Sequence, residues 1–163
     1  MEPFPYLYQI NSSQGGVPKV PIVEAWVTVK GIKGDKHRNR VLHGGLDRAL
    51  CVFSFEILHA LQQEGHTIYP GSSGENFTLA GLDWTQVKPG DQMKIGEDVL
   101  IELTTYCDPC RRNAQWFIGE DFHRISQQQH PGWSRLYARV LAEGTVRQGD
   151  RVWVEMLSER TVL

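Results

Sequence analysis

The segment Thr104–Arg112 carries residues that could do covalent or metal chemistry. Cys107 and Cys110 stand in Cys-Asp-Pro-Cys spacing, and Arg111 and Arg112 follow directly. A cysteine at the start of a predicted helix and beside guanidinium groups is favoured as thiolate, because the helix dipole and the positive charge both stabilise the anion. The thiolate is the nucleophilic and metal-binding form of cysteine. Cys110 is therefore the leading candidate for a reactive group, with a buried, inert thiol as the alternative.

Glycine and basic residues are interleaved in two further segments, Gly31–His37 and His43–Arg48. Glycine adopts positive φ angles that let backbone N–H groups approach a ligand closely, and the lysines and arginines add positive charge. This composition is typical of an anion-binding site. A pair of tight turns with solvated cations explains the same residues equally well.

A third polar cluster is the turn Gly71–Phe77, with the sequence Gly-Ser-Ser-Gly-Glu-Asn-Phe. Glu75 and Asn76 could contact a ligand directly or hold neighbouring loops in place. Polar residues in such turns often bond only to their own backbone, so a purely structural role stays open.

The composition limits the classes of function. A chain of 163 residues fits one domain, which we expect over residues 1–163 with a core at about 20–157. With 17 basic and 19 acidic residues the net charge is −2, so we expect no nucleic-acid partner. No apolar run approaches the roughly 20 residues of a membrane helix. We also find no signal sequence, and expect a cytoplasmic protein without a membrane partner.

The three cysteines are an odd number, and they do not suggest a secreted disulfide framework. Cys51 lies in the apolar run Ala49–Phe53, where a thiol usually behaves as a small buried hydrophobe. A structural zinc site could combine Cys107 and Cys110 with His37 and His43, although the proline between the two cysteines favours another use.

Short apolar stretches recur between glycine, proline, aspartate and asparagine, a pattern typical of an all-β barrel or sandwich. We predict strands at Val20–Val29, Val99–Leu103 and Arg151–Glu155. The segments Lys88–Ile95 and Arg147–Val154 each place an alternating strand after a Gly-Asp turn, which suits a closed barrel.

Two helices are predicted. In Ser54–Gly65, the serine can cap the N-terminus, three apolar residues share a face, and the glycine can end the helix in a left-handed conformation. A second helix is predicted over Arg111–Gln128, broken at Gly119.

Six motifs stand in a fixed order along the chain from about residue 22 to residue 156: Gly34-Asp35-x-His37, His43-Gly44-Gly45-x-Asp47-x-Ala49, Gly74-Glu75-Asn76, Gly90-Asp91, Pro109-Cys110 and Trp133–Gly144. Taken in this order, they resemble the series found in MOSC domains, the C-terminal domains of molybdenum-cofactor sulfurases. The resemblance implies a mostly β fold, a closed or partly closed β-barrel with a few peripheral helices.

The resemblance further implies binding of the molybdenum cofactor, with Cys110 as the molybdenum ligand or the carrier of sulfur. Soft thiolate coordination suits this metal. Pyridoxal phosphate is not expected, since the sulfurase domain whose lysine binds it is absent from the sequence. The residues that the resemblance places around the cofactor are Lys33, Gly34, Asp35, His37, His43, Gly44, Gly45, Asp47, Gly74, Glu75, Asn76 and Arg111.

Two functions follow from the resemblance. One is a molybdenum-dependent reductase of small N-hydroxylated compounds that receives electrons from a separate reductase. The other is a non-enzymatic carrier that holds sulfur or cofactor on Cys110 and passes it to a sulfur-transfer partner. Cys107 stands where members of the family often have arginine, and it is either a resolving thiol for Cys110 or only a small loop residue.

Overall fold

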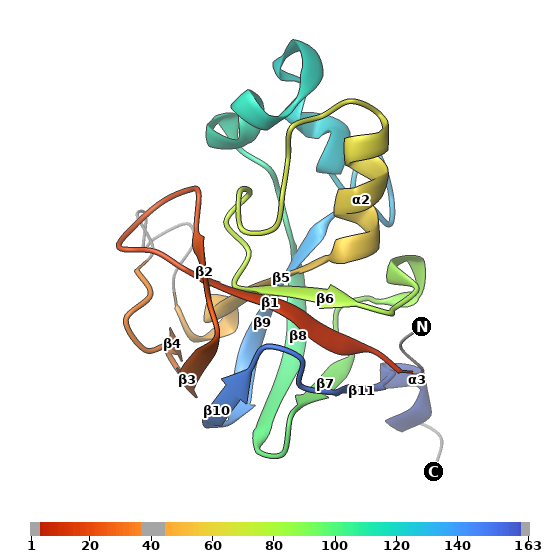
Figure 1. The fold of residues 1–163 in the computed structure, drawn as a ribbon. Helices are drawn as coiled ribbons and strands as arrows, with labels where there is room; N and C mark the ends of the chain where they lie inside the picture. Colours follow the sequence, from red (N-terminus) through yellow and green to blue (C-terminus); the bar gives the residue numbers. More distant parts are fainter. Residues whose placement is uncertain (1–3, 37–44, 161–163) are drawn as a thin grey trace.

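The chain folds into two β-sheets, with the helices of residues 55–63 and 111–125 gathered at one end, as the computed structural model shows for residues 4–36 and 45–160 (Figure 1). The larger sheet has the strand order β11-β7-β8-β9-β5-β6-β1-β2, and the smaller has the order β10-β3-β4. The strands are β1 (Tyr6–Ser12), β2 (Val20–Ile22), β3 (Glu24–Thr28), β4 (Gly31–Ile32), β5 (Leu50–Ser54), β6 (Phe77–Ala80), β7 (Gln92–Ile95), β8 (Val99–Cys107), β9 (Arg135–Ala142), β10 (Gly144–Arg147) and β11 (Val152–Glu155).

The mostly β prediction is confirmed, but the described residues do not form a closed barrel. The edge of β1 that faces β11 makes a single isolated bridge, between Tyr6 and Arg151. Further along the same edge, Ile10–Ser12 pair with β2 instead. Backbone hydrogen bonds of Pro5 and Leu7 with Gly149, Asp150 and Val152 flank the Tyr6–Arg151 bridge, but no strand ladder joins β1 to β11 among the described residues.

The two segments with Gly-Asp turns lie side by side. Strands β7 and β11 pair antiparallel, with Ile95 opposite Val152 and Gln92 opposite Glu155. The turn that starts at Gly96 joins β7 to β8, and β8 continues beyond the predicted Leu103. The predicted strand Val20–Val29 is wrong as one element, because the chain leaves the larger sheet after β2 and enters the smaller sheet as β3.

Helix α2 (Phe55–Gln63) confirms the first helix prediction. The Ser54 side chain accepts a hydrogen bond from the backbone N–H of Ile57 at 3.1 Å, and Gly65 has a φ of 102° just beyond the helix. Leu58 and Leu61 are buried against the core. The helix thus covers one end of the larger sheet (Figure 1).

The second predicted helix is not an α-helix. Three short 3-10 helices replace it, and the break at Gly119 is confirmed by a φ of 64° at that residue. None of the described helices has both the length and the apolar character needed to cross a membrane. The short helices are η1 (Leu46–Arg48), η2 (Trp84–Gln86), η3 (Arg111–Trp116), η4 (Ile118–Glu120), η5 (Phe122–Ile125) and the terminal α3 (Leu157–Arg160).

Candidate functional site

A pocket with about 550 Å³ of space between protein atoms, part of it open to solvent, lies where strands β5, β8 and β9 meet three loops. One wall is the loop between β1 and β2, another is the turn before β6, and a third is the start of η3. The residues that line it are Gly16, Val17, Lys19, Lys36, Cys51, Ser73, Gly74, Cys107, Cys110, Arg112, Asn113, Arg135 and Tyr137.

The floor of the pocket is one face of the larger sheet. Cys51 lies opposite Tyr137 across β5 and β9, and Cys107 lies opposite Arg135 across β9 and β8. Because paired residues and residues two apart on a strand point to the same face, these four side chains gather on one side of the sheet. We call Cys51, Cys107, Arg135 and Tyr137 the pocket floor.

Arg135 brings a buried positive charge to this floor. Its side chain donates to the backbone oxygen of Ser73 at 2.6 Å and to that of Asp108 at 3.3 Å. Its Nε has no hydrogen-bond partner, and it forms no ion pair with any acidic side chain among the described residues. A guanidinium that is only 5% exposed and lacks a carboxylate partner favours anions in the adjoining space.

The two floor thiols differ in their protonation. A hydrogen bond from Cys51 lowers the pKa of Cys107 to about 6, with help from the Arg135 charge and Tyr137 and against the effect of burial. The same hydrogen bond, together with burial, raises the pKa of Cys51 well above its ordinary value. Burial and the neighbouring sulfurs also raise the pKa of Tyr137. Of the two floor thiols, Cys107 is therefore the one that ionises more readily.

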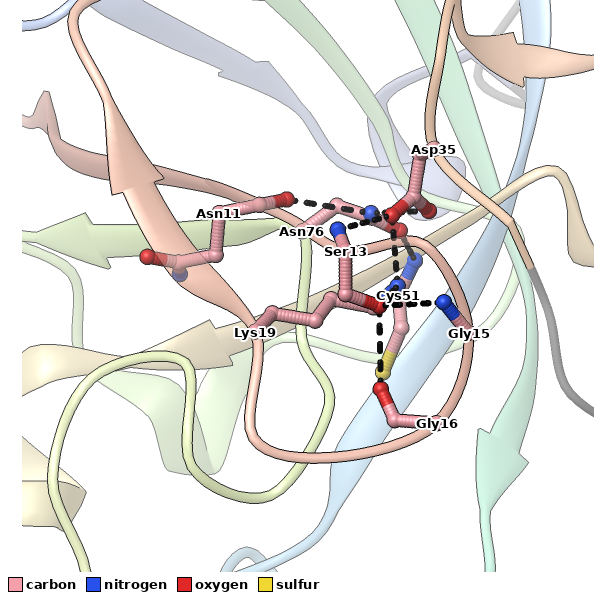
Figure 2. Close-up of polar contacts among 8 residues, drawn as sticks. All are labelled: Asn11, Ser13, Gly15, Gly16, Lys19, Asp35, Cys51 and Asn76. Carbon is pink, nitrogen blue, oxygen red and sulfur yellow. Dashed lines mark hydrogen bonds and ion pairs between the residues drawn. The ribbon is translucent and has the colours of Figure 1, made fainter.

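Asp35 stabilises the pocket wall that the loop between β1 and β2 forms, and Figure 2 shows its contacts. One carboxylate oxygen accepts from the Lys19 ammonium at 2.7 Å and from the backbone N–H of Ser13 at 2.8 Å. The other oxygen accepts from the Asn76 side chain at 2.9 Å. Asn76 also accepts from the backbone N–H of Cys51 at 3.0 Å, so this network joins the loop wall to strand β5.

Glycine is required at Gly71, where this wall passes close to another chain segment. A side-chain carbon there would lie 2.5 Å from the backbone oxygen of Lys19, and the residue has a φ of 89°. Both the contact and the left-handed conformation disfavour any larger residue.

Glu75 lies fully buried behind the pocket wall. One of its oxygens accepts from the Ser73 hydroxyl at 3.0 Å, while the other has no partner. Burial raises the pKa of Glu75 to about 7, although hydrogen bonds from Gly71 and Ser73 and the charge of Arg135 oppose the rise. Ser73 lines the pocket, so a titratable acid stands one hydroxyl group away from it.

Cys110 lies at the mouth of the pocket and is partly exposed, immediately before η3. Because η3 is a 3-10 helix of only six residues, the helix dipole that we expected to favour its thiolate is small. The positive charge near Cys110 comes instead from Lys36, Arg112 and Arg135, which line the same pocket. No acidic side chain lines it among the described residues.

The structure places the predicted cofactor residues in different surroundings. Gly74 lines the pocket with Cys110, whereas Asp35, Glu75 and Asn76 support its walls from behind. His37, His43 and Gly44 lie outside the described residues. Five predicted residues are exposed and are not among the lining residues: Lys33, Gly34, Gly45, Asp47 and Arg111.

The sequence predictions missed Arg135 and Tyr137. A signal for them exists in β9, where Leu136, Ala138 and Val140 alternate with polar residues and belong to the core. That alternation places Arg135 and Tyr137 on the opposite face, but it does not show that a pocket lies there. Among the described residues, no group of three or more His, Cys, Asp or Glu could hold a metal ion.

Comparison with known proteins identifies relatives of this chain. The family described as MOSC domain matches residues 39–153. The uncharacterized protein YflK of Bacillus subtilis is 32% identical over 93% of this chain and 67% of its own length. Protein YiiM of Escherichia coli is 32% identical over 76% of this chain and 55% of its own length. A Gibberella moniliformis protein named reductase is 28% identical, but the chain spans only 22% of it.

Solved structures agree with this result. The crystal structure of YiiM from Geobacillus stearothermophilus superposes with a TM-score of 0.71 at 22% identity, over 93% of this chain and 75% of that one. YiiM from Escherichia coli gives a TM-score of 0.67 at 24% identity, over 96% of this chain and 75% of that one. These similarities establish a shared fold.

Proposed function

This chain belongs to the MOSC domain family, and from that premise we propose that its pocket binds the molybdenum cofactor, with the Cys110 thiolate as a metal ligand. The observation that carries the proposal is the position of Cys110, a partly exposed cysteine at the mouth of a pocket that cationic side chains line without acidic ones among the described residues.

The charge of the pocket fits an anionic ligand. Lys19 is neutralised by Asp35, but Lys36, Arg112 and Arg135 form no ion pair with described acidic side chains. Phosphate-bearing ligands are recognised by such cations together with backbone N–H groups. The unpartnered Nε of Arg135 is a buried donor that a ligand oxygen would satisfy.

The shape of the wall supports the same assignment. Gly74 has a φ of 105°, and a side-chain carbon at this position would lie 3.0 Å from Val17 and 4.0 Å from the Arg135 guanidinium. The glycine therefore keeps the space beside Arg135 open and lets backbone groups approach a ligand.

The roles of the residues follow from these contacts. Arg135, Arg112 and Lys36 bind the anionic part of the ligand, and Cys110 offers the soft sulfur that suits molybdenum. Asp35 and Asn76 hold the wall, while Ser73 can exchange a proton with Glu75. When bound, the cofactor would supply two-electron chemistry for reducing an N-hydroxylated compound, with electrons from a separate reductase. The name of the relative called reductase, of which this chain spans 22%, supports a reduction without indicating the substrate.

Expression in cells that make the cofactor tests the proposal. Purified protein should contain molybdenum in a ratio near one per chain, together with the fluorescence of released pterin. Zinc in place of molybdenum, or neither metal, would contradict cofactor binding. If molybdenum is present, oxidation of an artificial electron donor that depends on an N-hydroxylated substrate supports the reductase, whereas a persulfide on Cys110 without turnover supports the carrier.

A further inference from the structure

The two floor thiols, Cys51 and Cys107, form a sulfur pair that the proposed cofactor chemistry does not use. Together with Tyr137 they make a separate buried cluster, apart from the main core. Cys51 and Cys107 lie close enough within this cluster that each shifts the pKa of the other. Both sulfurs also line the pocket, although the residues are only 4% and 2% exposed. A small solute that enters the pocket can therefore reach them.

Backbone geometry disfavours a direct disulfide between them. Strand β9 lies between β5, which carries Cys51, and β8, which carries Cys107. Their registers on β9 differ by two residues, at Tyr137 and Arg135. Two strand spacings separate the Cα atoms by roughly 9 Å or more, whereas a disulfide needs Cα atoms within about 7 Å. The strand order and register therefore disfavour a disulfide, although the two side chains share one buried cluster.

The two sulfurs of Cys51 and Cys107 favour a soft metal ion over a hard one. Among the described residues, Cys51 and Cys107 belong to no group of three or more His, Cys, Asp or Glu that could hold a metal ion, so they do not complete the four-coordinate shell of zinc. Hard cations prefer oxygen ligands. Copper(I) takes soft thiolate ligands, and among biological ions it matches a pair of sulfurs.

We propose that Cys51 and Cys107 bind one copper(I) ion between their sulfurs at the floor of the pocket. Both cysteines bind as thiolates: any proton that Cys51 or Cys107 carries is released to solvent as its copper–sulfur bond forms, and no electron is transferred. The resulting bis-thiolate complex carries one negative charge, which the buried and otherwise unpaired Arg135 guanidinium balances. The Nε–H group of Arg135, which has no hydrogen-bond partner, can donate a hydrogen bond to the negatively charged complex.

An anaerobic titration tests the site directly. The reduced full-length chain, free of molybdenum, competes with bicinchoninate for copper(I), and the absorbance of the chelate reports the copper that the protein removes. The wild type should take one copper(I) per chain. Since even supporting residues around a metal cost about 10–100-fold in affinity, loss of a sulfur ligand in Cys51→Ala or Cys107→Ser should weaken binding by more than about 100-fold.

Cys110→Ser is the matched control, because it removes the more exposed thiol and leaves the floor intact. It should bind copper(I) as the wild type does, and X-ray absorption at the copper edge should show two sulfur neighbours. Circular dichroism establishes that each variant is folded. Copper that is lost in Cys110→Ser, or that is retained in both folded floor variants, would overturn the proposal. Neither outcome depends on molybdenum, so the proposed cofactor function is tested separately.

Discussion

The floor and the rim of the pocket carry similar residue types in opposite environments. Arg135 and Cys107 are buried on the sheet, and the Arg135 Nε has no hydrogen-bond partner there. Arg112 and Cys110 belong to the rim around η3, where solvent reaches them. A charge in the interior interacts strongly and is costly to leave unpaired, whereas an exposed charge is screened. Arg135 on the floor should therefore contribute more to stability than Arg112 on the rim, although both are proposed to contact the ligand.

The largest expected difference concerns the two arginines. Arg135→Ala removes the hydrogen bonds to Ser73 and Asp108 and leaves a cavity, so it should lower the free energy of unfolding by about 3 kcal/mol. The matched rim variant Arg112→Ala should change it by less than about 0.5 kcal/mol. Urea denaturation measures both. Equal losses in the two variants would show that the floor and rim do not differ in this way.

The next effect concerns pH and Glu75. Because burial raises the pKa of this carboxyl from 4.5 to about 7, the folded state holds its proton more tightly than the unfolded state does. The contribution of Glu75 to the free energy of unfolding is then highest below pH 4.5 and falls as pH rises to 7, by roughly 3 kcal/mol at most.

The variant Glu75→Gln cannot titrate, so its stability should fall less than that of the wild type between pH 5 and pH 8. Unfolding curves at several pH values give this comparison. Parallel curves for the two proteins would mean that Glu75 ionises without cost in the folded state.

The smallest effect is a difference in thiol accessibility. Under native conditions iodoacetamide should modify Cys110 first, because Cys51 and Cys107 are buried in the floor. In denaturant all three thiols should react at similar rates. Mass spectrometry of digested protein locates the modified residues. Modification of Cys107 before Cys110 in the native state would place the reactive thiol on the floor instead of the rim.

The role of Cys107 as a resolving thiol for Cys110 stays a prediction. All three cysteines are free in the structure, and Cys107 is hydrogen-bonded to Cys51. Mild peroxide should form a Cys107–Cys110 bridge that dithiothreitol reverses if the resolving role is right. Oxidation of Cys110 alone to sulfinic acid, equally in the wild type and Cys107→Ser, would contradict it.

The sequence predicted the features that depend on interactions between residues close together in the chain. Ser54 and Gly65 identified α2 because capping depends on a few neighbouring residues. The neighbours of Cys110 in the Cys-Asp-Pro-Cys segment made it the candidate reactive residue, and the structure places it at the pocket. Its role as a metal ligand stays a prediction. The break between β2 and β3 was not visible, because it depends on which sheet each half of the segment joins.

The pocket floor depends on pairings between distant strands, and for this reason the sequence did not reveal it. Arg135 meets Cys107 only through the register of β8 and β9, and Cys51 joins them from β5. Likewise, the support that Asp35 gives to the pocket wall depends on Lys19, which lies on another loop, while its contact with a ligand stays a prediction. Burial of Glu75 is also a tertiary property that its turn motif does not specify.

The molybdenum content of Cys110→Ser tests the central claim most directly. Wild type and variant are purified in parallel from cofactor-producing cells, and metal analysis gives molybdenum per chain. Serine is nearly isosteric but a poor soft ligand, so the variant should fold with unchanged stability and lose its molybdenum. A folded variant that retains as much molybdenum as the wild type would contradict the assignment of Cys110 as the metal ligand.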